Sequence, residues 1–202
     1  LFLNKNALPT EEEQFEEYKK AAVLTKGMPL TIRTLDIGGD KDIPYMGLTK
    51  ETNPFLGYRA IRFCLDRVDI FTTQLRAILR ASAYGSIRIM IPMITSVNEV
   101  RQVKDMIKKI CSDLDHNGIS YDKNIQTGVM IETPAAAIMA DAIAQEVDFF
   151  SIGTNDLTQY TIAVDRCNEN VAYLYSAFNP AVLRLIRRII ECAHNAGIEA
   201  GM

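Results

Sequence analysis

Residues 127–134, Thr-Gly-Val-Met-Ile-Glu-Thr-Pro, contain the pattern that decides the fold. The run that ends at Ile131 is short and apolar, which is typical of a strand buried on both faces. Thr133 and Pro134 are residues that favour the start of a helix, so a helix is expected directly after the strand. Residues 147–156 repeat the arrangement, with an apolar run followed by Gly-Thr-Asn-Asp. A buried strand that leads into a helix is the repeating unit of a parallel sheet.

The same alternation extends in both directions from this stretch. Capping boxes at Thr10/Glu13 and Ser96/Glu99 mark two further helix starts. Residues 113–123 form a polar connector. Strands are expected over residues 29–37, 87–94, 127–131, 147–152 and 197–201. Helices are expected over residues 10–25, 53–65, 69–83, 157–164 and 179–194, and from residues 96 and 133.

Strands separated by helices predict an α/β protein with a parallel sheet. Two architectures satisfy this pattern, a doubly wound open sheet and a (β/α)8 barrel. A complete barrel needs eight strands and typically about 250 residues. If the architecture is a barrel, the 202 residues of this chain hold one that lacks strands at both ends.

Composition narrows the class of protein. With 48% hydrophobic and 23% charged residues the chain is an ordinary globular one, and a net charge of −3 gives no reason to expect a nucleic-acid or membrane surface. Four cysteines with no close pair indicate reduced thiols, as in a cytoplasmic protein. No apolar run approaches the roughly 20 residues of a membrane helix, so membrane insertion is not expected.

Acidic side chains follow two of the expected strands. Glu132 comes directly after one strand and Asp156 shortly after the next. Ligands bind at the carboxyl ends of parallel strands, and two carboxylates there suit Mg²⁺, whose remaining ligands are water and substrate oxygens. The alternative for Glu132 is an ion pair with a buried arginine.

Three arginines lie near expected strand ends, and arginine binds phosphate and carboxylate oxygens with two parallel hydrogen bonds. Arg33 could instead pair with Asp36, Arg59 could lie on the surface of its helix, and Arg166 shares this ambiguity. Gly153 allows close backbone approach, and Asn155 supplies a donor at the start of a helix, where anions bind. The residues alone therefore indicate Mg²⁺ and a small phosphorylated anion.

Four long segments carry a family resemblance: residues 33–41, 53–62, 128–137 and 148–166. They resemble the phosphoenolpyruvate-binding barrel of Enzyme I of the bacterial sugar phosphotransferase system. The resemblance implies a (β/α)8 TIM barrel of the phosphoenolpyruvate/pyruvate type that is incomplete, with about five of eight strands. It also implies a single domain over residues 1–202, truncated at both ends.

The resemblance further implies Mg²⁺-dependent transfer of a phosphoryl group from phosphoenolpyruvate to an enzyme histidine and on to the carrier HPr. Glu132 and Asp156 would bind the metal ion. The substrate would be bound by Arg33, Arg59 and Arg166, by the backbone N–H of Asn155, and by Lys41, which matches the lysine of the family's Gly-Gly-Asp-Lys loop.

The sequence also departs from the family pattern. The family's proton-donating cysteine follows the Gly-Met at which this chain stops, and the acceptor histidine belongs to a separate N-terminal domain, which also binds HPr. We therefore expect no catalytic residue within the chain and no turnover by the isolated chain. The resemblance also implies a homodimer in the cytoplasm.

Four alternatives remain open from sequence. Pyruvate phosphate dikinase and phosphoenolpyruvate synthase resemble the same barrel, and the nitrogen-related paralogue of Enzyme I matches equally well. A metal-dependent aldolase of the pyruvate-enolate type also uses a Glu/Asp pair, although it does not need three phosphate-directed arginines. The last alternative is a non-catalytic piece that binds phosphoenolpyruvate or forms a dimer.

Overall fold

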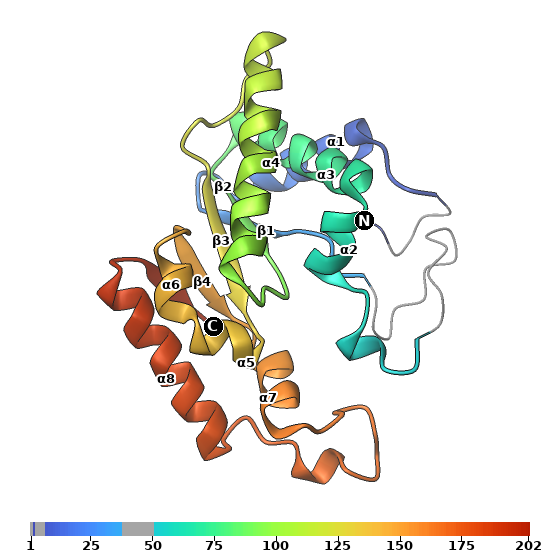
Figure 1. Ribbon diagram of the computed structural model, residues 1–202. Coiled ribbons are helices and arrows are strands. Elements are labelled where there is room, and N and C mark those ends of the chain that lie inside the picture. The colour runs from blue at the N-terminus through green and yellow to red at the C-terminus, as the bar shows by residue number, and fades with distance from the viewer. Residues whose placement is uncertain (1, 3–6, 38–50) are drawn as a thin grey trace. The chain divides into compact units, whose positions relative to one another are not determined.

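The computed structural model describes residue 2 and residues 7–37 and 51–202, and within these ranges it contains five strands (Figure 1). Their order in the sheet is β1-β2-β3-β4-β5. β4 is parallel to both neighbours, with Ile131 opposite Ile152 and Phe150 opposite Ala200. The strands are β1 (Leu30–Arg33), β2 (Ile87–Ile91), β3 (Gln126–Ile131), β4 (Phe149–Ile152) and β5 (Glu199–Gly201).

The strand order decides between the two architectures left open by the sequence. A doubly wound sheet reverses its strand order at a switch point, whereas the strands of a (β/α)8 barrel follow one another as in the chain. The observed order is consecutive. The described residues therefore form part of a parallel (β/α)8 barrel, with five of its eight strands.

Helices connect these strands, as the alternating pattern predicts. No helix in the described ranges is long and apolar enough to cross a membrane. The α-helices are α1 (Glu11–Leu24), α2 (Ala60–Asp66), α3 (Val68–Ala81), α4 (Val97–His116), α5 (Pro134–Ile138), α6 (Ala140–Ala144), α7 (Thr154–Ile162) and α8 (Pro180–Asn195). Short 3-10 helices lie at Pro54–Leu56, Ser82–Tyr84 and Ala172–Leu174.

The chain divides into two compact units, residues 1–89 with 102–126 and residues 90–101 with 127–202. In the first unit α1 packs against α3. Arg80 joins the two helices, because its guanidinium lies 4.1 Å from the centre of the Phe15 ring and pairs with Glu11 and Glu12. The core of this unit is large and apolar, with Phe63, Phe71, Leu75, Ile78, Leu79 and Leu114 fully buried.

In the second unit α8 packs against α5, α6, α7, β4 and β5 (Figure 1). Its start is fixed by Asn179, whose side chain accepts the N–H of Ala181 at 2.9 Å. Thr133 caps α5 in the same manner, by accepting the N–H of Ala136 at 3.1 Å. The helix starts expected at these two positions are confirmed.

The expected continuous helix over 53–65 is wrong in its first half. A 3-10 helix ends at Leu56, and α2 begins only at Ala60. The side chain of Asn53 makes no capping hydrogen bond. Both carboxylate oxygens of Glu51 lie within hydrogen-bonding distance of the N–H of Tyr58, at 3.0 and 3.1 Å, and this N–H would otherwise continue the helix.

Other boundaries also differ from expectation. β1 and β2 are shorter than predicted, since both strands end before the apolar run does. α4 continues to His116, so the polar connector begins later than residue 113. α7 begins at Thr154 instead of residue 157, which places Asn155 and Asp156 in its first turn. The last difference bears directly on the candidate site.

Candidate active-site residues

Glu132 directly follows β3 in the second unit, and its residue surface is 3% exposed. Its Oε1 accepts a hydrogen bond from the backbone N–H of Met93 at 2.7 Å. Met93 has a φ of +60°, a left-handed conformation that costs energy for a residue with a Cβ. The strained backbone after β2 is thus the donor to the buried carboxylate.

Gly153 has no side chain, and the Glu132 side chain occupies the position next to it. A Cβ at residue 153 would lie 2.6 Å from both the Cβ and Oε2 of Glu132, and 3.0 Å from Cγ of Met130. The carboxylate therefore packs against bare backbone at the residue that precedes α7. The close approach explains why a glycine stands between β4 and the helix.

Asp156 lies in the first turn of α7 and is 6% exposed. The positive end of the helix dipole favours a carboxylate at this position. Its Oδ1 is 3.0 Å from Nη1 of Arg166, and Arg166 is itself held by its backbone N–H, which donates to Oε1 of Gln159 at 3.1 Å. The ion pair neutralises one of the two buried carboxylates.

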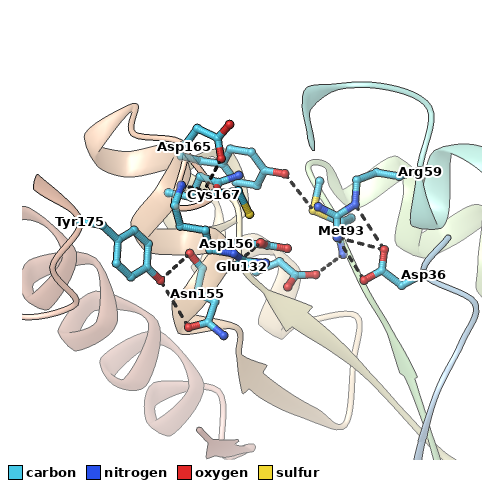
Figure 2. A network of polar contacts seen from close by, with 12 residues as sticks. Asp36, Arg59, Met93, Glu132, Asn155, Asp156, Asp165, Cys167 and Tyr175 are labelled. Atoms are coloured by element: carbon cyan, nitrogen blue, oxygen red, sulfur yellow. Dashed lines mark hydrogen bonds and ion pairs between the residues drawn. The ribbon is translucent and has the colours of Figure 1, made fainter. Parts of the chain in front are cut away.

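Tyr175 contacts Asn155, the neighbour of Asp156. Its hydroxyl lies 3.1 Å from the backbone oxygen and 3.3 Å from Oδ1 of Asn155 (Figure 2). Both residues belong to the second unit. Asn155 is therefore fixed through its backbone and its side chain together.

In the first unit Arg59 pairs with Asp36. Nη2 of Arg59 lies 3.0 and 3.1 Å from the two carboxylate oxygens, and Nε lies 3.3 Å from Oδ1. Nη1 of Arg33 approaches Oδ2 of the same carboxylate at 3.6 Å. Arg33 is much more accessible than Arg59, with a side chain that is 43% exposed.

The backbone before Asp36 is held by two side chains. Oε1 of Gln74 accepts the N–H of Leu35 at 2.9 Å, and Sγ of Cys64 lies 3.6 Å from the Leu35 carbonyl oxygen. Burial, with a smaller contribution from the charge of Asp36, raises the pKa of the Cys64 thiol to about 12. Cys64 is therefore a neutral donor over the whole physiological pH range.

The structure brings the predicted site residues together in two groups. Glu132, Asn155, Asp156 and Arg166 lie at the carboxyl ends of β3 and β4, which are paired strands of the second unit. In the first unit, Arg33 and Arg59 share Asp36. Arg33 thus makes the ion pair that the sequence left open, while Arg59 is buried and not a surface residue of its helix. Lys41 lies outside the described residues.

Three residues of these groups were not predicted. Met93 contacts Glu132, Gln159 holds the backbone of Arg166, and Tyr175 holds Asn155. The left-handed backbone of Met93 leaves no signal in the sequence, because methionine rarely adopts it. Gln159 and Tyr175 act through contacts within the fold, although both lie close in sequence to residues that were singled out.

The second unit offers a donor set for a hard divalent cation. Both carboxylates are nearly buried, and removing a carboxylate from water is costly unless it is paired. Within the described ranges, no three histidine, cysteine, aspartate or glutamate side chains form a cluster that could enclose a metal ion. Two protein carboxylates with water and substrate oxygens are a common set for Mg²⁺, so the residues fit this ion.

The chain belongs to the family described as the PEP-binding domain of PEP-utilising enzymes, which matches residues 1–202. It is 57% identical to the phosphoenolpyruvate-protein phosphotransferase of Buchnera aphidicola subsp. Acyrthosiphon pisum (strain APS) and 54% identical to that of Bacillus subtilis (strain 168). Both alignments cover 100% of this chain and 35% of the relative. The chain thus spans about a third of the length of these curated relatives, and the resemblance found in the motifs is confirmed.

A solved structure supports the fold class. The citrate lyase of Burkholderia xenovorans LB400 is similar with a TM-score of 0.50 and 20% sequence identity. The similarity covers 64% of this chain and 39% of that chain. At this identity the likeness concerns the fold alone.

Proposed function

We propose that this chain is the phosphoenolpyruvate-binding part of a phosphoenolpyruvate-protein phosphotransferase. The proposed reaction transfers the phosphoryl group from phosphoenolpyruvate to a histidine of the enzyme and then to HPr. The observation that carries the proposal is the pair of buried carboxylates, Glu132 and Asp156, at the ends of β3 and β4 in a chain of the PEP-binding family. The names of relatives at 54–57% identity support the same activity.

Glu132 and Asp156 would hold Mg²⁺ in this reaction. When bound, the ion would neutralise charge on the phosphoryl oxygens as the group departs. Both carboxylates are already held in place: Glu132 accepts a hydrogen bond from the N–H of Met93, and Asp156 forms an ion pair with Arg166. The two carboxylates are thereby fixed before substrate binds, which avoids a cost of ordering them.

Arg166 and Asn155 would bind the substrate beside the metal site. The guanidinium of Arg166 pairs with Asp156 and is partly exposed. The backbone N–H of Asn155 lies in the first turn of α7, where free N–H groups bind anions. From the sequence resemblance we also assign Arg33, Arg59 and Lys41 to the phosphate and carboxylate of phosphoenolpyruvate. Assignment to HPr, to a homodimer and to the cytoplasm rests on the same resemblance.

The test uses a full-length phosphotransferase that carries this chain. Glu132→Gln and Asp156→Asn should each abolish the Mg²⁺-dependent transfer of label from phosphoenolpyruvate to protein, while the circular dichroism spectrum stays unchanged. Asp105→Asn, on the exposed surface of α4, is the matched control and should retain full activity. Near-normal labelling of both site variants would show that the metal assignment is wrong.

The same assay separates the proposed enzyme from a dikinase-type barrel. A phosphotransferase phosphorylates itself from phosphoenolpyruvate without nucleotide and passes the group to a protein. Consumption of phosphoenolpyruvate that requires AMP would instead indicate the dikinase or synthase reaction.

A further inference from the structure

The segment that follows α7 reaches back to the first turn of this helix at two adjacent residues. Arg166 pairs with Asp156. Tyr175 binds Asn155 (Figure 2). Arg166 and Asp156 already have places in the proposed function. Tyr175 has none, and neither the family description nor the motif resemblance assigns it one.

Tyr175 is suited to orient the side chain of Asn155. A tyrosine hydroxyl donates one hydrogen, and here both nearby acceptors, the backbone oxygen and Oδ1, belong to Asn155. An asparagine amide has an acceptor on one side and two donors on the other. With the acceptor side held by the hydroxyl, the amide nitrogen lies on the side away from Tyr175 (Figure 2).

The orientation matters for an anionic ligand. A phosphate or carboxylate oxygen only accepts hydrogen bonds, so an amide that turned its Oδ1 toward the ligand would repel it. Rotation of the Asn155 side chain would exchange these two faces. The hydrogen bond that the Tyr175 hydroxyl donates to Oδ1 favours the orientation in which the amide nitrogen faces away from the tyrosine.

We propose that Tyr175 is a positioning residue that keeps the amide donors of Asn155 directed at an anionic oxygen of the substrate. The proposal rests on the proposed function, since it assumes that the side-chain amide of Asn155, in addition to its backbone N–H, contacts phosphoenolpyruvate. Tyr175 acts through Asn155 and takes no part in the chemistry. Its loss should weaken substrate binding more than it slows the reaction.

The experiment measures KM for phosphoenolpyruvate and kcat in a full-length phosphotransferase that carries this chain. Tyr175→Phe removes the hydroxyl and keeps the ring. One neutral hydrogen bond corresponds to about a fivefold change, so KM should rise about fivefold. The kcat should stay within about twofold, because an interaction equal in ground and transition states affects KM alone.

Two further variants distinguish positioning from a structural role. Tyr173→Phe is the matched control: Tyr173 lies two residues earlier, is 80% exposed, and should give unchanged KM and kcat. In an Asn155→Ala background Tyr175→Phe should have a much smaller effect on KM, because only the contact with the backbone oxygen of residue 155 then remains. The melting temperatures of all variants show whether each is folded.

The outcomes distinguish a failure of the positioning role of Tyr175 from a failure of the proposed phosphotransferase function. An unchanged KM in Tyr175→Phe, or an equal rise in the presence and absence of the Asn155 side chain, overturns the positioning role while the phosphotransferase assignment stands. If Glu132→Gln also leaves transfer from phosphoenolpyruvate intact, the proposed function fails, and the role of Tyr175 fails with it.

Discussion

Arg59 donates to Asp36 from two of its nitrogens, with contacts of 3.0, 3.1 and 3.3 Å, and both side chains are nearly buried, at 7% and 6% exposed. Ion pairs on a protein surface contribute little to stability. A buried pair behaves differently, because removal of one partner leaves an uncompensated charge out of water. The pair also fixes Asp36, which Arg33 approaches from the end of β1.

We therefore expect Arg59→Ala to lower the free energy of unfolding by about 3–5 kcal/mol. The double variant Asp36→Ala/Arg59→Ala should lose less than the sum of the two single changes, since it leaves no unpaired charge. Urea denaturation of the three variants, followed by circular dichroism, measures both quantities. Additive losses would mean that the two side chains do not depend on each other.

The second prediction concerns Arg33 and substrate binding. Lysine provides a point charge but not the two-pronged contact of a guanidinium. Arg33→Lys should therefore reduce kcat/KM for phosphoenolpyruvate nearly as much as Arg33→Ala, when both are measured in a full-length phosphotransferase. Wild-type activity in Arg33→Lys would restrict Arg33 to its ion pair with Asp36.

The third prediction concerns Gly153. Gly153→Ala would place a methyl group 2.6 Å from Glu132, so β3 and β4 must shift to accept it. We expect a loss of at least tenfold in the rate of phosphoryl transfer and a lower melting temperature, since overpacking typically costs about 1–3 kcal/mol. Unchanged transfer and an unchanged melting temperature in Gly153→Ala would contradict the tight contact.

The fourth prediction is a dependence of stability on alkaline pH. The pKa of the Cys64 thiol rises from 9.0 to about 12 in the folded protein, chiefly through burial. A raised pKa in an acidic group means that the folded state favours the protonated thiol. This stabilisation is complete below pH 9 and is lost as the pH rises from about 9 to about 12.

The measurement compares wild type with Cys64→Ala by urea denaturation at several pH values. The free energy of unfolding of wild type should fall relative to the variant by up to about 1.4 kcal/mol per pH unit above pH 9. The comparison cancels the tyrosines and lysines that titrate in the same range. Parallel curves for the two proteins would show that the thiol titrates alike in the folded and unfolded states.

Sequence patterns predicted those features that depend on neighbours along the chain. The apolar runs located all five strands of the described region, and the caps at Thr10, Thr133 and Asn179 marked helix starts correctly. The parallel order expected for the strands also placed Glu132 and Asp156 after two strands that are paired, β3 and β4. Such features need only local propensity and the parallel topology.

Features that depend on contacts across the fold could not be predicted in this way. The helix over 53–65 is interrupted because Glu51 accepts the N–H of Tyr58. The sequence left open whether Arg59 lies on the surface, and only its position beside the buried Asp36 decides this. The strain at Met93 and the role of Tyr175 depend on where Glu132 and Asn155 lie, which no local pattern contains.

Gly153 has a consequence for how related sequences should diverge. A side chain there would meet the Cβ of Glu132 as well as its carboxylate, and every residue except glycine has a Cβ. A descendant that abandoned the chemistry could exchange Glu132, Asp156 and Arg166, but it would still need glycine at 153 as long as β3 and β4 keep their spacing. The glycine should therefore record common ancestry, while the carboxylates should record which lineages have kept the proposed metal site.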